Sequence, residues 1–470
     1  MRNRLRPAMG FPHTTARRRY ILAATLAALL ATGCEKQTTP PPKDGPASLP
    51  AERPRPAPAQ RPVHRAALLL AQAQFEQKLG ADGKIQTVPG AAKLTFAYPD
   101  GDGWTSEILE DPDSNVFHKA MPFDVPGGLP GILTIGANEA PKPAIAKIWR
   151  RTRSGWTGVI LSQATFDGRF NRYRDVEIAD VTGDAQPEIV IATHDQGAVG
   201  VLEKKGQRWE ATLIDQALNT FVHEIEIGDV DGDGLNEIFA TPSAPNRRDN
   251  TLQPGQVIMY RYDGRQFTRQ VVDAFEDRHA KEILIANVLG PGPPNLYAVV
   301  EPRYNKDAAP TDDGPPVEIK EYRFTNPDPD PDPEPGPEPA ANVIATVIAT
   351  LPDKKCRFLH AGDVDDDGQV ELVASAFKSG LWMIKHTDSG WETHLIDADS
   401  SGYEHASTLA DLDGDGHLEI YVADDNGHRL RRYRWTGQDF DRTDLLDLTK
   451  GDITFGLTPC LNPRCLTAPQ

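Results

Sequence analysis

The sequence has 470 residues, and its 68 acidic residues outnumber 50 lysines and arginines, giving a formal net charge of −18. A chain this acidic would be repelled by a phosphate backbone, so nucleic acid is excluded as the expected partner. No GxSxG, HExxH or phosphate-cradling glycine loop occurs, so the sequence indicates no common catalytic class and an enzyme is the less favoured expectation.

The N-terminus has the pattern of an export signal. Arginines crowd the first residues, an apolar run follows from Ile21 to Leu30, and then comes Ala31-Thr32-Gly33-Cys34. This pattern resembles a bacterial lipoprotein signal, which implies that residues 1–34 are removed or modified and that Cys34 carries the lipid. The alternative is an ordinary cleaved signal with Cys34 incidental. The resemblance implies a protein lipid-anchored in the cell envelope, at the outer membrane or the cell surface.

No other apolar run reaches the roughly 20 residues that a membrane-spanning helix needs, so acyl chains would be the only anchor. Residues 35–62 are rich in proline and alanine and predict an extended tether. Residues 63–91 predict a short helical lead-in, with Leu68, Leu69, Leu70 and Phe75 as a partial apolar face. Residues 92–470 are predicted to form one domain, interrupted by a disordered acidic, proline-rich spacer at 327–334.

Two features recur along this domain. The first is a turn followed by an aromatic residue and an apolar strand, found at Trp104, Trp156, Trp209, Phe267, Trp391 and Phe440. The second is an acidic loop or a degenerate copy of it, beginning at Asp124, Asp180, Asp229, Asn287, Asp363 and Asp411. Alternating or continuously apolar runs between them predict about four strands in about 50 residues, the size of a propeller blade.

The acidic loops carry carboxylates on alternate residues, then a glycine, then a closing glutamate before the next strand. Such a loop offers a hard cation such as Ca²⁺ the several oxygens that it needs. The expected metal ligands are Asp229, Asp231, Asp233 and Glu237; Asp363, Asp365, Asp367 and Glu371; Asp411, Asp413, Asp415 and Glu419; and, in a weaker copy, Asp180, Asp184 and Glu188.

These repeats resemble the FG-GAP or VCBS-type repeats of integrin-like propellers, over about 370 residues. The resemblance implies a Ca²⁺-binding β-propeller. The units at Asp124 and Asn287 keep the turn but lack the carboxylates, so their blades are expected to be metal-free. We predict an all-β fold with seven blades, six or eight being the alternatives. The last inner strand, around Asp452–Leu457, would close the ring with the first strands of the domain.

Cys460 and Cys465 are close enough in sequence to form a disulfide, leaving Cys356 unpaired, but the sequence does not decide the pairing.

Basic residues recur six positions before each acidic loop or its degenerate copy. Equivalent positions of the inner strands would form a ring at the mouth of the central channel, opposite the loops. Lys450 is expected to complete this ring. One interpretation is that each basic residue pairs with nearby acids such as Glu224, Glu282 and Glu404. The other is an anion-recognising pocket, strengthened as the histidines protonate below about pH 6.5. The candidate ligand-binding residues are His118, Arg174, His223, Lys281, Arg357 and His405.

Several functions stay open. The favoured one is an extracytoplasmic scaffold, expected to be monomeric, that binds a protein or an acidic glycan. The alternatives are a polysaccharide-active, lyase-like enzyme with its site in the central channel, a structural envelope component, and an assembly factor. The fold by itself selects none of them.

Overall fold

The structure is a computed structural model that describes residues 66–80, 83–166, 168–206, 208–247, 251–303, 315–325 and 342–468. The predicted signal with Cys34, the tether at 35–62 and the acidic spacer at 327–334 lie outside these residues. Within the described ranges, no helix has the length and apolarity that crossing a membrane requires.

The described residues form an all-β fold of antiparallel strands with one short helix. Four separate sheets each contain four strands paired in chain order. Their bounds are β12 (Phe221–Gly228), β13 (Glu237–Ser243), β14 (Gly255–Tyr262) and β15 (Phe267–Phe275); β16 (Arg278–Ala286), β17 (Asn295–Pro302), β18 (Val317–Thr325) and β19 (Asn342–Leu351); β20 (Cys356–Gly362), β21 (Glu371–Ala376), β22 (Leu381–Thr387) and β23 (Gly390–Asp397); and β24 (Ser407–Ala410), β25 (Glu419–Asp424), β26 (Arg429–Trp435) and β27 (Phe440–Asp447).

The remaining described strands belong to one larger sheet, in which the same order of four recurs. Two runs are β4 (Val116–Phe123), β5 (Gly131–Glu139), β6 (Ala144–Thr152) and β7 (Gly155–Ala164), and β8 (Phe170–Ala179), β9 (Glu188–Thr193), β10 (Ala198–Lys205) and β11 (Arg208–Gln216). The third run joins the two ends of the domain: β28 (Ile453–Cys460) pairs with β1 (Ala67–Leu79), followed by β2 (Ile85–Asp100) and β3 (Gly103–Asp111). The helix α1 (Pro463–Leu466) follows β28.

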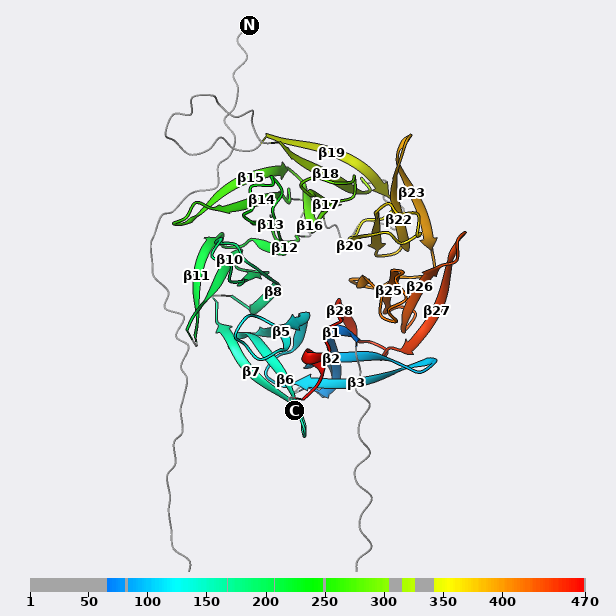
Figure 1. Ribbon diagram of the computed structural model, residues 1–470. Helices are drawn as coiled ribbons and strands as arrows, with labels where there is room; N and C mark the ends of the chain where they lie inside the picture. The colour runs from blue at the N-terminus through cyan, green and yellow to red at the C-terminus, as the bar shows by residue number, and fades with distance from the viewer. Residues whose placement is uncertain are drawn as a thin grey trace, which may run out of the picture. The chain divides into compact units, whose positions relative to one another are not determined.

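Figure 1 shows these groups of strands arranged around a common centre. The first strand of each group lies innermost and contacts the first strand of the next, in the order β4, β8, β12, β16, β20, β24 and β28, and β28 contacts β4 again. The aromatic landmarks of the sequence begin the outermost strands, as Trp104 does in β3 and Trp391 in β23.

The helical lead-in predicted for residues 63–91 is wrong, because the described residues of this segment form β1 and the start of β2. Leu68 and Leu70 pack in one apolar cluster with Tyr421 and Leu457, whereas Leu69 packs in another with Phe96. The strand is thus buried on both faces, which gives a continuous apolar run that periodicity alone does not distinguish from a helix. The N-terminal part therefore contributes three strands to the group that β28 completes.

The three described cysteines, Cys356, Cys460 and Cys465, are buried free thiols. Cys460 Sγ lies 3.7 Å from the carbonyl oxygen of Asn462, and Cys465 Sγ lies 4.0 Å from that of Phe123. The structure therefore shows no disulfide among the described residues.

Candidate functional site

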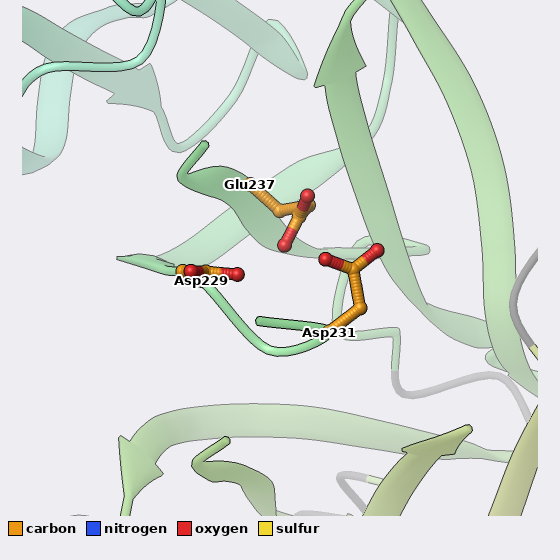
Figure 2. Close-up of side chains that lie close together, drawn as sticks. All are labelled: Asp229, Asp231 and Glu237. Atoms are coloured by element: carbon orange, nitrogen blue, oxygen red, sulfur yellow. The ribbon is translucent and has the colours of Figure 1, made fainter. Parts of the chain in front are cut away.

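Three acidic loops bring their carboxylates together. Asp229, Asp231 and Glu237 each place a carboxylate oxygen within 4.8 Å of the others, and Figure 2 shows the three side chains pointing toward one another. The same grouping occurs at Asp363, Asp365 and Glu371, and at Asp411, Asp413 and Glu419. We call these three segments, 229–237, 363–371 and 411–419, the carboxylate loops.

The first aspartate of each carboxylate loop shapes the turn. Asp229 Oδ1 accepts a hydrogen bond from the Gly232 amide at 2.7 Å, and Oδ2 accepts one from the Gly234 amide at 2.9 Å. Gly234 has a φ of +90°, a conformation that favours glycine. The closing Glu237 accepts from the Val230 amide at 3.2 Å, which returns its carboxylate over the loop. The loop therefore gathers oxygens of three of the four expected ligands, whereas the remaining expected ligands of the three loops, Asp233, Asp367 and Asp415, are not part of these groups.

Some of these oxygens lack partners. Asp365 Oδ1, Glu371 Oε1 and Glu419 Oε1 are buried and have no hydrogen-bond partner among the described residues. Burial raises the pKa of Glu237 and of Glu371 to about 7, because a desolvated carboxylate beside other acids disfavours its charged form. A hard cation would supply both the missing partner and the missing charge, so the donor set fits a metal ion.

A basic side chain from the third strand of each sheet faces each carboxylate loop. Arg261 Nε donates to Glu237 at 3.0 Å, and its guanidinium also pairs with Asp231. Lys385 lies 2.6 Å from Asp367 and 3.3 Å from Glu371. Arg434 pairs with Asp415 and lies 3.8 Å from Glu419. The sequence did not predict these basic residues, but they share one position in the strand pairing. The residue after each closing glutamate pairs with a residue of the third strand, as Ile238 pairs with Tyr260, and the basic residue comes directly after that partner.

The weaker fourth loop does not form such a group within the described residues. Asp180 accepts from the backbone amides of Gly183 and Ala185, and Glu188 accepts from Val181. The register of β9 and β10 places Glu203 where the other sheets have a basic residue. Burial raises the pKa of Glu188, and the neighbouring carboxylates, Glu203 among them, raise it further.

The Asp124 unit, which was expected to lack metal, has a structural role instead. Asp124 Oδ2 accepts from Asn462 Nδ2 at 2.8 Å and from Arg464 at 3.0 Å, so it holds the C-terminal helix.

The predicted basic ring lies on irregular positions of the innermost strands. The pairing register shifts at His118 in β4, Arg174 in β8, His223 in β12, Lys281 in β16 and Arg357 in β20. His405 lies just before β24 and has a φ of 58°. A bulge inserts one residue that is left out of the strand pairing, and it changes the direction of that residue's side chain. This explains how the basic residue of each strand differs in orientation from its neighbours.

Two of these residues meet across the centre. Arg357 Nε donates to Glu301 at 2.7 Å, and its NH1 lies 3.4 Å from Glu404 Oε2. Arg174, from a strand far away in sequence, reaches the same Glu404 oxygen at 3.5 Å. The sequence named Glu404 as a possible partner, but it missed Glu301, which lies on β17. We call Arg174, His223, Lys281 and Arg357 the central basic cluster.

Lys281 and His223 differ from the arginines because they have no hydrogen-bond partner in the described chain. Lys281 is 2% exposed and its Nζ is unpartnered, and His223 is 3% exposed with both ring nitrogens unpartnered. Burial, reinforced by Arg357, lowers the pKa of Lys281 well below its usual value. Burial and Lys281 lower that of His223.

The expectation that the histidines protonate below about pH 6.5 is wrong. Burial holds the pKa of His118 and His223 well below the usual value, and lowers that of His405 to about 4. His118 Nδ1 hydrogen-bonds the Tyr173 carbonyl at 2.7 Å, and His405 bridges the Ala376 carbonyl and Ser400 Oγ, both at 2.7 Å. These two histidines act as structural links.

Lys450 does not complete the ring, because it is exposed in a turn before β28. The register shift in β28 falls at Phe455, whose ring packs edge-on to His118 with centroids 5.1 Å apart. An aromatic contact therefore takes the position at which the sequence predicted a charge.

A layer of carboxylates follows the basic cluster along the same strands. Lys119 Nζ lies 2.8 Å from Asp175, contacts Glu177 and is 4.0 Å from Glu224. Burial opposes ionisation of Asp175, but Lys119 and hydrogen bonds more than offset it and lower its pKa. Burial and the Asp175 charge raise the pKa of Glu224 well above its usual value. Glu224 and Glu282, the expected partners of the basic ring, lie in electrostatic range of Lys119, and Glu282 is also in range of Arg174 from that ring.

No protein-family model matches this sequence, and no curated protein matches it. Among solved structures, a candidate 6-phosphogluconolactonase from Bacteroides fragilis superposes with a TM-score of 0.50 at 11% identity, covering 85% of this chain and 99% of that one. An Agrocybe aegerita lectin that recognises terminal N-acetylglucosamine gives 0.45 at 12% identity, covering 82% and 91%. The periplasmic gluconolactonase of Pseudomonas aeruginosa gives 0.45 at 12%, covering 82% and 97%. At these identities the likeness concerns the fold alone, which is all-β and propeller-like.

Proposed function

We propose that this chain is a membrane-anchored, calcium-stabilised, seven-bladed β-propeller of the FG-GAP or VCBS type, which acts as an extracytoplasmic binding scaffold for a protein or glycan. The observation that carries the binding role is the convergence of Arg174 and Arg357 on Glu404 beside the unpartnered Lys281. Charged groups brought from separate strands into one buried cluster, and left incompletely paired there, mark a recognition site better than a folding contact.

The blade count rests on strand pairing. The four separate sheets and the three runs within the larger sheet share one order of strands, and their innermost strands contact one another in a closed series. The antiparallel pairing of β28 with β1 would close the ring and leave no free sheet edge between its two ends.

The calcium assignment rests on the carboxylate loops. Asp229, Asp231 and Glu237, and their equivalents in the other two loops, would hold the ion. Bound Ca²⁺ would supply positive charge and fix the geometry of the loops. Asp229 stabilises the turn of the loop by accepting a hydrogen bond from the Gly232 amide. Arg261 pairs with Glu237 and would compete with the ion for this carboxylate.

The lipid anchor rests on the Cys34 pattern, and changing that residue tests it. Cys34→Ser should move the protein from the membrane fraction into the soluble envelope fraction, because the sequence offers no other anchor. Cell fractionation followed by immunoblotting measures the distribution. Membrane association equal to that of the parent would refute the anchor.

Capture of partners tests the binding role. The purified protein should retain specific proteins or glycans from envelope extract, and a variant carrying Arg174→Ala, His223→Ala and Arg357→Ala should lose them. The matched control replaces two exposed arginines, Arg169 and Arg265, and the half-buried Arg429 by alanine. Both variants must first show the parent's calcium-dependent melting. Retention of every partner by the cluster variant would show that the cluster is structural.

The carboxylate layer favours an enzyme as the second candidate. Asp175 and Glu224 lie next to each other with pKa values shifted in opposite directions, an arrangement that supplies one ionised and one protonated carboxyl for acid–base chemistry. A panel of acidic and neutral polysaccharides, assayed for new reducing or unsaturated ends, tests this role. Activity that Glu224→Gln abolishes would establish the enzyme, and its absence across the panel would leave the scaffold.

A further inference from the structure

We infer that the central basic cluster binds the carboxylate of an acidic sugar, with Lys281 Nζ as the principal hydrogen-bond donor. This inference rests on the proposed binding function and specifies the ligand of the same site. It is argued from the ion pairs of the cluster, from its unpartnered polar atoms and from the aromatic groups beside it.

The ion pairs of the cluster leave one basic side chain unmatched. Arg174, Lys281 and Arg357 face Glu301 and Glu404. Arg357 takes the closest contacts with both acids, at 2.7 and 3.4 Å, and Arg174 shares Glu404 at 3.5 Å. Lys281 forms no hydrogen bond with either of them. A single negative charge would complete the set, which suits a carboxylate better than a phosphate dianion.

The unpartnered atoms make an empty cluster costly. A buried donor without an acceptor keeps the penalty of leaving water, and native proteins leave few such groups. Here Lys281 Nζ and the N–H of the neutral His223 ring are in that condition, and the other ring nitrogen of His223 is an acceptor without a donor; the two residues lie on neighbouring strands β16 and β12. Since burial lowers the pKa of Lys281, an anion beside its Nζ would also restore the charged form. One carboxylate would thus accept from Lys281 Nζ and from the N–H of His223, the two donors that the described protein leaves unsatisfied.

Aromatic side chains near the cluster suit a sugar ring. Tyr403 is 49% exposed, lies in electrostatic range of Arg357 and Arg172, and has Lys355 Nζ 5.0 Å from its ring centroid. The guanidiniums of Arg172 and Arg169 lie 3.8 and 4.8 Å from the Phe170 ring centroid, which leaves Tyr403 as the aromatic group open to a sugar. An exposed aromatic face with a polar edge accommodates the apolar face of a pyranose, while the cations bind its carboxylate.

Titration of the purified protein with galacturonate, galactose and acetate tests the inference. Galactose lacks the carboxylate and acetate lacks the ring, so each removes one half of the proposed recognition. Isothermal titration calorimetry should show galacturonate binding at least about tenfold tighter than either control. Lys281→Met should weaken galacturonate about tenfold or more, and Lys281→Gln serves as a second variant in case the first does not fold.

Thermal melting without ligand provides the second readout. Lys281→Met should melt no lower than the parent, because it removes an unsatisfied buried group. The matched control is Lys147→Met, since Lys147 is equally buried but holds Asp111 and Asp113 at 2.6 and 2.7 Å. That control should lower Tm by about 2 °C or more and leave galacturonate affinity unchanged.

Several results would overturn the inference: equal binding of acetate and galacturonate, unchanged affinity in Lys281→Met and Lys281→Gln, or a loss of ligand-free stability in Lys281→Met as large as in Lys147→Met. Failure of the two proposals is distinguishable. A protein that captures envelope partners through the cluster but does not bind galacturonate refutes only the ligand, whereas one that neither captures a partner nor binds galacturonate refutes the scaffold as well.

Discussion

The carboxylate loops and the central basic cluster carry opposite excesses of charge on the same set of sheets. In the loops, Glu371 Oε1 and Glu419 Oε1 are buried acceptors that form no hydrogen bond, although Lys385 and Arg434 lie 3.3 and 3.8 Å from them. In the cluster, Lys281 Nζ is a buried donor without an acceptor. Buried charge is costly unless it is paired, so each imbalance indicates a missing ion of the opposite sign.

The two regions also differ in how the chain compensates for the imbalance. Each carboxylate loop faces a basic residue from another strand, as Arg261 faces Asp231 and Glu237. In the cluster, Glu301 and Glu404 neutralise the arginines but not Lys281. The loops are therefore partly neutralised without a metal, whereas Lys281 has no such substitute.

Removing calcium should cause the largest loss of stability, and it acts on the carboxylate loops. If the three carboxylate loops bind the ion, chelation should remove roughly 2.7 kcal/mol of unfolding free energy per site, relative to a hundredfold excess of calcium over Kd. Differential scanning calorimetry with and without chelator measures the loss of Tm. Glu188→Gln is the control, since its loop forms no carboxylate group in the described structure and the variant should retain the parent's calcium dependence. An unchanged Tm on chelation would contradict the metal assignment.

Acidification should lower the free energy of unfolding through the protonation of His405. Its folded pKa of about 4 lies below the ordinary value of 6.5, because burial outweighs the Ala376 carbonyl and the nearby Asp424 and Asp353. Between these two pKa values the unfolded chain binds a proton at His405 that the folded chain does not bind. The contribution of His405 to the free energy of unfolding is therefore intact above about pH 6.5 and falls by about 1.4 kcal/mol per pH unit toward pH 4.

Comparing the parent with His405→Asn separates the effect of His405 from that of Glu224 and Glu282. The raised pKa values of these two carboxyl groups make the fold more stable as the pH falls, which is the opposite effect. Asparagine tolerates the positive φ of this position. Denaturant unfolding should show the parent's stability advantage shrinking between pH 6.5 and pH 4. An advantage that does not change with pH would mean that the pKa of His405 is the same in the folded and the unfolded chain.

The smallest expected effect concerns Arg261, the basic side chain that faces the first carboxylate loop. Arg261→Gln should tighten calcium binding by about two- to fivefold, because it removes a positive charge that competes for Asp231 and Glu237. Arg269→Gln is the matched control, since Arg269 pairs with Asp215 away from the loops. Calcium titration of both variants measures the difference. Weaker calcium binding by Arg261→Gln would show that the arginine organises the loop rather than competing with the metal.

Local spacing made the loops predictable from sequence. Asp229, Asp231 and Glu237 lie within one turn, so the chain itself fixes their proximity. The recurrence of the basic residues also located Arg174 and Arg357 correctly on inner strands. In contrast, Arg261 and Glu301 reach their partners through strand pairing and contacts between sheets, which sequence spacing does not show.

The strand β1 was missed for a related reason. Leu68, Leu69 and Leu70 form a continuous apolar run, and only the pairing with β28, from the other end of the domain, makes it a strand buried on both faces. The same register places Phe455 rather than Lys450 beside His118.

A crystal structure of the purified protein grown with calcium and galacturonate tests the central claim most directly, because it examines both charge imbalances at once. The account predicts anomalous scattering from calcium at the three carboxylate loops and a galacturonate carboxylate within hydrogen-bond distance of Lys281 Nζ. Loops occupied only by Arg261, Lys385 and Arg434, together with a Lys281 that bonds to protein atoms or water alone, would contradict it.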